Sequence, residues 1–321
     1  MSAPLDSVNV TIRPMTAADL EPTIALLVSA AGADKRHRLT ERLTSAAPDE
    51  IHYAFVAELA GTVIGAGKLT TEPVFPGTAS TLVAVAEAYR GAGVGTALAA
   101  KLAEAARELP AGTVVTSALR DDLDRGRRFA ERYGLAVTHH SVGWRFDLAG
   151  RGEEVAGLAR AAGERAGIRI RVTDLASDDA TVMACVGRTL VGLPVPGGEN
   201  QDVDLAQARG YFSDTSVVLL AEPLGPGHSE PWGLSVIDEQ VGTGDWYTVY
   251  TGVEVAHRGA GVASALKTAA LRYAYDVGAV ALTTHNDDTN EPILRLNRAL
   301  GMVPSVGYWS LARTPDVADP A

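Results

Sequence analysis

The segment His-Arg-Gly-Ala-Gly-Val-Ala-Ser at residues 257–264 repeats the segment Tyr-Arg-Gly-Ala-Gly-Val-Gly-Thr at residues 89–96, an offset of 258 − 90 = 168 residues. Three further pairs of similar segments occur in the same order along the chain. They are residues 10–14 with 168–172, 132–135 with 299–302, and 141–144 with 305–308. Such a repeat is much longer than the unit of a solenoid, so each copy is expected to fold as a domain with its own core.

The two copies predict two domains of one kind. We assign residues 1–149 to an N-terminal domain, 150–167 to a linker or connecting helix, and 168–321 to a C-terminal domain. Within each copy, apolar segments typical of strands alternate with amphipathic segments typical of helices, and a hairpin is predicted around Ala60-Gly61. The predicted fold class is α/β, with α+β character and a mixed sheet. A chain of 321 residues is long enough for two such domains.

In both copies a predicted strand leads directly into the glycine-rich segment, which opens a long amphipathic helix. The first amides of a helix lack an intrahelical acceptor, and with the helix dipole they favour an anion. Glycine lets phosphate oxygens approach the backbone, although it also serves tight strand-to-helix packing. A dinucleotide fingerprint needs a third glycine where Thr96 and Ser264 stand, and the ending of a P-loop is missing. The duplication favours an anion-binding turn in each copy.

The glycine-rich segments resemble the Arg/Gln-x-x-Gly-x-Gly/Ala signature of the GNAT superfamily of N-acetyltransferases, and the resemblance covers nearly all of both copies. It implies two GNAT-like acyl-CoA N-acyltransferase domains in tandem. In that family the amides of the turn hold the pyrophosphate of acetyl-CoA, and the preceding strand pairs with the pantetheine arm of coenzyme A. The coenzyme residues that the resemblance implies are Val83, Val85, Arg90, Gly91, Gly93, Val94, Gly95 and Thr96 in the first copy, and Val253, Val255, Arg258, Gly259, Gly261, Val262, Ala263, Ser264 and Asn290 in the second.

A second segment, residues 290–302, resembles a later motif of the same family. In that motif an Asn near a helix start contacts the coenzyme, and a Tyr four residues before a Gly often protonates the departing thiolate. Asn290 matches the first position, whereas Asn297 stands at the position of the Tyr and is our second catalytic candidate. The first copy has Leu123 and Ala130 at these places. We therefore expect the C-terminal domain to be catalytic and the N-terminal domain to be degenerate.

Acetyl transfer to an amine requires a neutral amine, a donor for the carbonyl oxygen and a leaving thiolate. Because a thiol has a pKa near ~8.5, its thiolate leaves without a dedicated acid. The family often places a carboxylate base on the strand before the glycine turn. Here the commonest position holds Tyr247, and Asp245, two residues earlier, is our candidate base. A cap of the turn at residues 242–244 is an equally good interpretation of Asp245. Trp246, Tyr247 and Tyr250 line either the substrate site or, more often for strand aromatics, the core.

Composition excludes several other classes of protein. The net charge of −11 argues against a general nucleic-acid binder. No apolar segment approaches the ~20 residues of a membrane span, and the start of the chain does not read as a signal peptide. The single cysteine, Cys185, can form no internal disulfide, so a cytoplasmic protein is expected. The seven histidines form no metal-ligand pattern. The arginines at 125, 127, 128 and 132 decorate an exposed helix or contact an adenosine phosphate.

The function that follows is transfer of an acetyl group from acetyl-CoA to a primary amine of a small molecule by direct attack. One alternative is a non-catalytic acyl-CoA-binding or regulatory protein, because both copies lack the Tyr. Another is a mycothiol synthase-like enzyme, which shares the tandem architecture but carries that Tyr. The acceptor is expected to contact variable loops at 193–200 and 223–231. The sequence predicts no oligomeric state.

Overall fold

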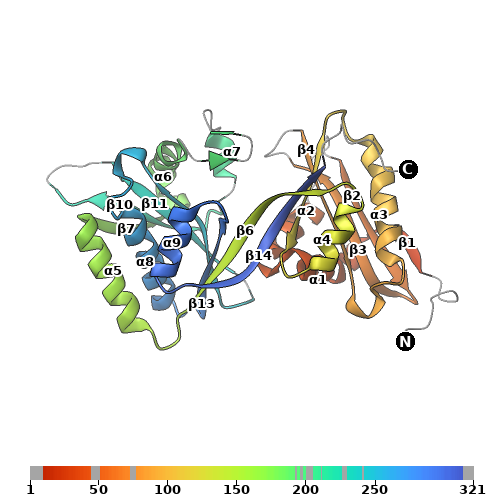
Figure 1. The fold of residues 1–321 in the computed structure, drawn as a ribbon, viewed down its shortest axis with the longest axis horizontal. Helices are drawn as coiled ribbons and strands as arrows, with labels where there is room; N and C mark the ends of the chain where they lie inside the picture. The colour runs from red at the N-terminus through yellow and green to blue at the C-terminus, as the bar shows by residue number, and fades with distance from the viewer. Residues whose placement is uncertain are drawn as a thin grey trace. The chain divides into compact units, whose positions relative to one another are not determined.

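The computed structural model describes residues 10–44, 51–72, 77–191, 194–195, 198–199, 205–210, 212–225, 230–240 and 242–313. The chain forms two compact units: unit 1 is Met1–Ser141 with Val306–Ala321, and unit 2 is Val142–Ser305. Each unit combines a mixed β-sheet with helices on both of its faces, which is the predicted fold class (Figure 1).

Unit 1 contains a sheet in the order β1-β2-β3-β4-β5-β14, in which β4 and β5 are parallel and the other neighbours antiparallel. Its strands are β1 (Thr11–Pro14), β2 (His52–Leu59), β3 (Thr62–Thr71), β4 (Thr78–Val85), β5 (Val114–Arg120) and most of β14 (Val303–Arg313). Its helices are α1 (Leu20–Ala31), α2 (Arg36–Thr44), α3 (Val94–Ala105) and α4 (Asp124–Glu131), with the short 3-10 helices η1 (Ala17–Asp19), η2 (Ala33–Lys35), η3 (Glu87–Tyr89) and η4 (Ala106–Glu108).

Alternation along the strands of unit 1 separates two cores. Ala66 and Leu82 pack with Ile24 and Leu27 of α1 on one face. On the other face α3 packs on β2, β3 and β4 through residues such as Leu98. The hairpin between β2 and β3 forms where predicted, because Ala60 and Gly61 have φ of +47° and +80°, as a two-residue turn of a twisted hairpin requires.

Unit 2 repeats this plan with the strand order β13-β12-β11-β10-β7, and the end of β6 lies beside β13. Its strands are β7 (Ile168–Asp174), β10 (Val217–Pro223), β11 (Gly233–Glu239), β12 (Trp246–Val253) and β13 (Ala281–Asp287), with a separate short pair β8 (Pro194–Val195) and β9 (Gly198–Glu199). Its helices are α5 (Gly152–Ala166), α6 (Leu175–Leu190), α7 (Leu205–Arg209), α8 (Val262–Asp276) and α9 (Glu291–Ala299), with the 3-10 helix η5 (Val255–His257).

The two faces of this sheet are named here by their helices. On the α8 face, Leu266 and Ala270 of α8 pack with Leu219 and Val253, and α9 joins the same core. On the α6 face, Val186 of α6 packs with Val218, Val236 and other strand residues. The parallel neighbours are β12 and β13, which correspond to β4 and β5 of unit 1.

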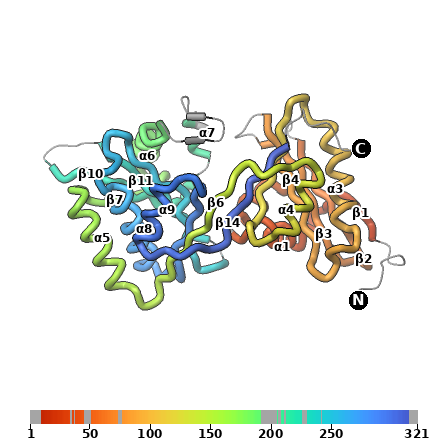
Figure 2. The backbone as a smooth tube through the Cα atoms, in the orientation of Figure 1, coloured from red at the N-terminus to blue at the C-terminus, as the bar shows by residue number. Residues whose placement is uncertain are grey.

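The compact units differ from the domains expected at 1–149 and 168–321. Strand β6 (Ala136–Asp147) continues from unit 1 into unit 2 at Val142, and β14 returns to unit 1, where Tyr308 to Arg313 pair with β5 (Figure 2). The segment at 150–167, expected to be a linker or connecting helix, contains helix α5, which buries Val155, Ala162 and Ala166 and packs along α8. The last strand of each half of the sequence therefore begins in its own unit and ends in the other.

Candidate functional site

In each unit two parallel strands begin side by side and then separate. In unit 1 the pairs between β4 and β5 run from Thr78 to Ser80, and in unit 2 those between β12 and β13 are Trp246 with Leu282 and Tyr247 with Thr283. Past these pairs, residues 81–85 and 248–253, all of them described, have no strand partner on that side. Each unit thus presents an opening whose edge of peptide groups can pair with an extended ligand.

The opening in unit 2 is shaped by a bulge. Val236 pairs with Tyr250 and Ile237 with Thr248, so Val249 is an extra residue in β12. In unit 1 the pairs between β3 and β4 run without a shift from Gly65–Val85 to Thr71–Ala79. A bulge bends its strand and increases the local twist, which favours separation from a neighbour.

The predicted anion-binding turn follows the opening in both units with the same backbone. Gly91 and Gly93 have φ of +83° and +86°, and Gly259 and Gly261 have +77° and +86°. The second glycine is the N-cap of α3 or α8, and its carbonyl accepts the first helical hydrogen bond, from Ala97 or Ala265. The three amides before that bond therefore project from the helix end.

These amides belong to the predicted residues. They are those of Val94, Gly95 and Thr96 in unit 1 and of Val262, Ala263 and Ser264 in unit 2. A Cβ added at Gly91, Gly93 or Gly259 would meet nothing within 4 Å, and one at Gly261 would meet only the Cβ of Ala166 at 3.8 Å. The turns are thus bare on their outer side, as phosphate approach requires.

The signature arginines hold the turns in place. The Nε of Arg90 donates to the carbonyl of Val85 at 3.0 Å, and that of Arg258 donates to the carbonyl of Val253 at 3.1 Å. Each guanidinium therefore ties the turn to the last residue of the preceding strand. The turn has its ligand-ready shape before any anion binds.

One coenzyme residue predicted on the strand lies elsewhere. Strand β12 ends at Val253, and Val255 begins the 3-10 helix η5 with 56% of its surface exposed. The expectation that a strand leads directly into the glycines was wrong in both units, because η3 and η5 intervene. Val83, Val85 and Val253 do lie on strands, β4 and β12, at the opening.

Helix α9 brings the two predicted asparagines to the α8 face. Asn290 is its N-cap and accepts from the amide of Ile293 at 3.4 Å. Asn297 is fully buried, and its Nδ2 donates to Oδ1 of Asn286 on β13 at 2.7 Å. Among the described residues, the Oδ1 of Asn297 has no hydrogen-bond donor. A buried acceptor without a donor usually marks the place of a water or ligand.

A second pair, absent from the sequence prediction, lies on the α6 face of the same opening. Alternation from Leu282, in the core of the α8 face, directs His285 to the opposite face. Its Nδ1 lies 3.2 Å from the hydroxyl of Tyr247, the last residue of β12 that pairs with β13. The sequence pointed to Tyr247 alone, as the residue at the family's usual base position and as one of three aromatics that line either the substrate site or the core.

Asp245 lies two residues before Tyr247, just outside the end of β12 that pairs with β13. Its carboxylate accepts from Arg145 at 2.6 Å, and its carbonyl accepts from the amide of Gln240 at 2.9 Å. It precedes the paired end of β12, roughly 25 Å along the strand from Val253. The carboxylate of Asp245 therefore pairs with Arg145, and only the backbone of Asp245 bonds to the turn, through its amide to Thr243 and its carbonyl to Gln240.

Unit 1 has different side chains at the corresponding positions. The strand pairs place Ser80 where unit 2 has Tyr247, and Ala118 where it has His285. On the other face Leu119 and Ala130 replace Asn286 and Asn297. Ser80 instead accepts from the Nζ of Lys68 at 2.9 Å, and burial lowers the pKa of Lys68 to about 8.

The remaining candidates are parts of the core. Trp246 packs on Tyr273 with ring centres 5.4 Å apart. Tyr250 bonds Thr189 at 2.9 Å, and burial raises its pKa to about 12. Burial also raises the pKa of Cys185 to about 12. The acceptor loop expected at 193–200 lies largely outside the described residues, and so does the middle of the one at 223–231.

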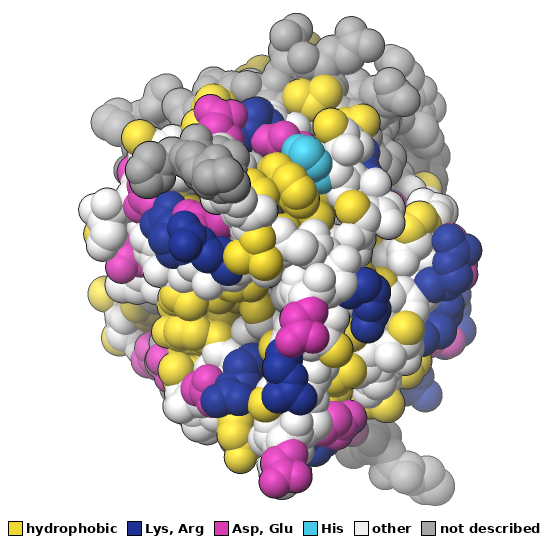
Figure 3. Space-filling view, turned by 90° about the vertical axis from the view of Figure 1, so that its left-hand side faces the viewer, with side chains coloured by type: hydrophobic (Ala, Val, Ile, Leu, Met, Phe, Trp, Pro, Cys, Tyr) yellow, Lys and Arg dark blue, Asp and Glu magenta, His cyan; other side chains and the backbone are white. Residues whose placement is uncertain are grey.

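Several classes of site are not seen in the part of the chain that the structure describes. It contains no group of His, Cys, Asp and Glu side chains that could hold a metal ion. No helix there is both long enough and apolar enough to pass through a bilayer. On the face of unit 2 in Figure 3, acidic, basic and apolar side chains are interspersed.

Comparison with known proteins identifies the fold of the chain and finds a family model that matches part of it. The sequence model of the acetyltransferase (GNAT) family matches residues 22–135. A tandem GNAT protein of the clavulanic acid biosynthesis pathway has a TM-score of 0.70 at 20% identity, over 97% of this chain and 100% of that one. A GCN5-related N-acetyltransferase from Sphaerobacter thermophilus has 0.67 at 18%, over 97% and 96%. One from Kribbella flavida has 0.51 at 16%, over 97% and 72%. No curated protein sequence matches significantly.

Residues 22–135 thus match the sequence model of the acetyltransferase (GNAT) family. The solved structures show that the chain as a whole has the tandem GNAT fold. The predicted tandem fold is confirmed.

Proposed function

We propose that this protein is an acetyl-CoA-dependent N-acetyltransferase for a primary amine of a small molecule, and that unit 2 carries out the transfer. The observation that carries this proposal is the placement of polar side chains on both faces of one opening. Asn286 and Asn297 lie on the α8 face, and Tyr247 and His285 lie on the α6 face. Acetyl transfer brings a thioester and an amine together, and an opening with polar groups on both faces lets one of them approach from each face.

The coenzyme fits the α8 face of unit 2. The bare turn at Gly259 and Gly261 suits a pyrophosphate on the amides of residues 262–264, and the unpaired edge of β12 suits the pantetheine arm. Asn297 offers a buried Oδ1 to a ligand N–H or to a water. When bound, acetyl-CoA supplies a thioester carbon that the amine attacks. Donation from Asn286 or Asn297 amide groups would stabilise charge on the carbonyl oxygen.

His285 is the base we propose in place of Asp245. It lies on the face opposite the coenzyme, where an amine could approach through the opening. The imidazole would accept a proton from the ammonium form of the substrate, and Tyr247 would orient the ring through the 3.2 Å contact. No acid is needed for the thiolate, whose pKa of ~8.5 makes it an adequate leaving group.

Unit 1 favours a second role for the same fold. Its turn has the torsions of unit 2, but Ser80 and Ala118 replace the Tyr–His pair. We propose that unit 1 binds acyl-CoA without turnover, which assigns the non-catalytic alternative to one half of the chain. A cytoplasmic location belongs to the same proposal, and the buried free thiol of Cys185 is compatible with it.

Matched variants test the assignment of the two units. Thr96→Glu and Ser264→Glu each place a carboxylate at the third position of α3 or α8, where it favours the helix. About 5 Å from a pyrophosphate carrying two charges, it opposes binding by about 3 kcal/mol at an effective dielectric constant near ~40, on the order of 100-fold in Kd.

Calorimetry with coenzyme A gives the number of sites, and thiol release with a panel of small amines gives transfer. Ser264→Glu should leave one coenzyme site and no transfer, whereas Thr96→Glu should leave one site and native transfer. Survival of transfer in Ser264→Glu would place the chemistry outside unit 2. Coenzyme binding without thiol release for any amine would favour the non-catalytic alternative for the whole chain.

A further inference from the structure

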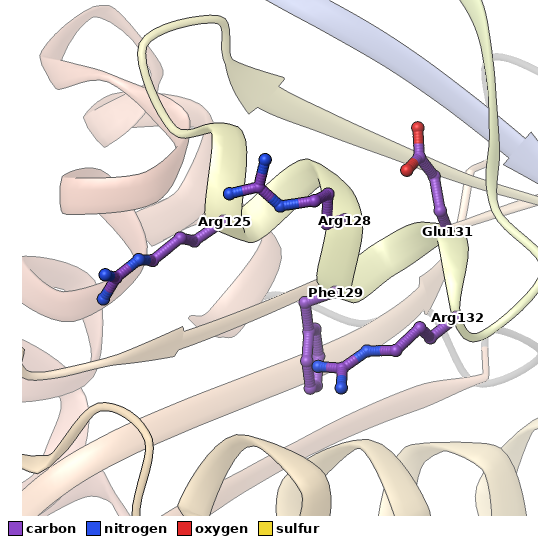
Figure 4. A pocket seen from close by; sticks show the side chains of 5 residues that line it. All are labelled: Arg125, Arg128, Phe129, Glu131 and Arg132. Atoms are coloured by element: carbon purple, nitrogen blue, oxygen red, sulfur yellow. The ribbon is translucent and has the colours of Figure 1, made fainter.

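Helix α4 of unit 1 carries a basic stripe with an aromatic ring at its centre. Arg125, Phe129 and Arg132 are spaced by four and three residues, so they lie along one face of the helix. With Arg128 and Glu131 they line an open pocket of about 660 Å³ (Figure 4).

The stripe borders the anion-binding turn of unit 1. The ring of Phe129 lies 3.6 Å from the place that a Cβ on Gly95 would take, and Val85 lies at the same distance. Gly95 supplies one of the three amides that project from α3. A phosphate on these amides would therefore have the ring of Phe129 as a neighbour, and the arginines of the stripe extend from the same helix as that ring.

The positive charges of the stripe are largely not neutralised by carboxylates of the described residues. In the described chain, neither Arg125 nor Arg132 has a carboxylate partner, and Arg132 lies over the ring of Phe129 at 5.4 Å from its centre. Arg128 has only an exposed contact of 3.6 Å to Asp124. A guanidinium on an aromatic ring is weakly hydrated and preorganised, which suits phosphate binding.

The equivalent helix of unit 2 lacks these features. Its arginines, Arg295 and Arg298, share the carboxylate of Glu291 at 3.9 and 3.5 Å. Leu296 stands at the position of Phe129. The basic stripe is therefore a property of unit 1, although unit 1 lacks the polar groups at the opening.

We propose that Arg125, Arg128 and Arg132, with the ring of Phe129, form a subsite in unit 1 for the 3′-phosphate of coenzyme A. The subsite rests on the proposed coenzyme site at the turn of α3. Coenzyme A differs from its dephospho form only by this phosphomonoester, which carries the charge and oxygen geometry that a guanidinium binds in bidentate fashion. Unit 1 consequently selects the 3′-phosphorylated coenzyme, and unit 2 is much less selective.

The test compares coenzyme A with 3′-dephospho-coenzyme A by calorimetry on the full chain. Ser264→Glu closes unit 2 and reports on unit 1, while Thr96→Glu closes unit 1 and reports on unit 2. In the Ser264→Glu protein we expect coenzyme A to bind on the order of tenfold more tightly than the dephospho form, the value of a charge-assisted hydrogen bond. In the Thr96→Glu protein the ratio should be near one.

Substitution of the arginines locates the effect. Adding Arg125→Ala and Arg132→Ala to Ser264→Glu should reduce coenzyme A affinity to that of the dephospho form. The matched control is Arg107→Ala, which removes one exposed positive charge in η4 of the same unit. A tenfold preference that survives the double substitution, or an equal loss for both ligands, overturns the subsite.

Failure of the subsite can be told apart from failure of the coenzyme site. If the Ser264→Glu protein binds neither ligand but the Thr96→Glu protein binds coenzyme A, the subsite falls and the proposed activity of unit 2 stands. If neither protein binds either ligand, both proposals fall.

Discussion

Replacing the buried amide pair of unit 2 by the apolar pair of unit 1 should separate stability from chemistry. The double variant Asn286→Leu with Asn297→Ala reproduces Leu119 and Ala130, which occupy these positions in the other unit. Because unit 1 folds with that pair, the substitution introduces a combination that this fold already accommodates.

The structure gives the expected magnitudes. Asn297 is fully buried and its Oδ1 already lacks a donor, so Asn286→Leu alone newly leaves its Nδ2 without an acceptor, at a cost of about 1 to 3 kcal/mol. Asn297→Ala alone removes the donor to Asn286 and leaves a small cavity, at about 1 to 3 kcal/mol. The double variant removes every side-chain polar atom of the pair, and its free energy of unfolding should lie within about 1 kcal/mol of that of the native protein. The sum of the two single effects should therefore exceed the double effect by about 1 kcal/mol or more.

Urea unfolding gives the three free energies, and thiol release with an accepted amine gives the rate. We expect the double variant to be as stable as the native protein, to bind coenzyme A through the intact turn, and to transfer acetyl groups at least 100-fold more slowly, the typical effect of removing an oxyanion donor. Additive single effects would refute the energetic reasoning. Native turnover in the double variant would refute a role for this pair in the chemistry.

Three further outcomes follow from individual residues. Burial lowers the pKa of Lys267 to about 8, so its charge destabilises the native state fully below pH 8. Lys267→Met should therefore raise the free energy of unfolding on the order of 3 kcal/mol at pH 7, and this gain should shrink as the pH rises from 8 toward 10.5. A gain that stays constant with pH in urea unfolding would contradict this. His285→Gln should slow acetyl transfer by roughly 10²-fold or more with unchanged coenzyme affinity in calorimetry, and equal kcat values would remove it as the base. Gly233→Ala would make a Cβ overlap the carbonyl oxygen of Gly252 and should lower stability by about 2 kcal/mol or more. In the matched Gly65→Ala the Cβ meets only side-chain carbons at 3.1 Å, so the loss of stability should be smaller. Thermal unfolding compares the two variants.

The glycine turns were predictable because their requirements are local. A left-handed φ at Gly93 and Gly261 and a bare outer surface can be inferred from a few adjacent residues. The side chains at the opening could not be inferred in this way. His285 and Tyr247 meet only because β12 and β13 pair at Thr283, and that register involves segments far apart in the sequence.

A single extra residue in β12 also changes the sequence offset between corresponding residues of the two units. Val253 aligns with Val85 at an offset of 253 − 85 = 168, whereas Tyr247 aligns with Ser80 at 247 − 80 = 167, because the bulge at Val249 lies between them. Bulges depend on the pairing of neighbouring strands and leave no clear local signal. The exchange of β6 and β14 between the units was missed for the same reason, since each strand reads alike in either sheet.

The divergence of the two units follows the energetic cost of their polar groups. A buried amide pair with an unpartnered oxygen lowers stability, and Leu119 with Ala130 avoids this cost in unit 1. The turn at Gly91 and Gly93 carries no such cost, because its amides face solvent when no ligand is bound, and it is retained in both units. A polar pair on each face of the opening is found only in unit 2, where the transfer that we propose needs donors and a base on opposite sides of the same gap.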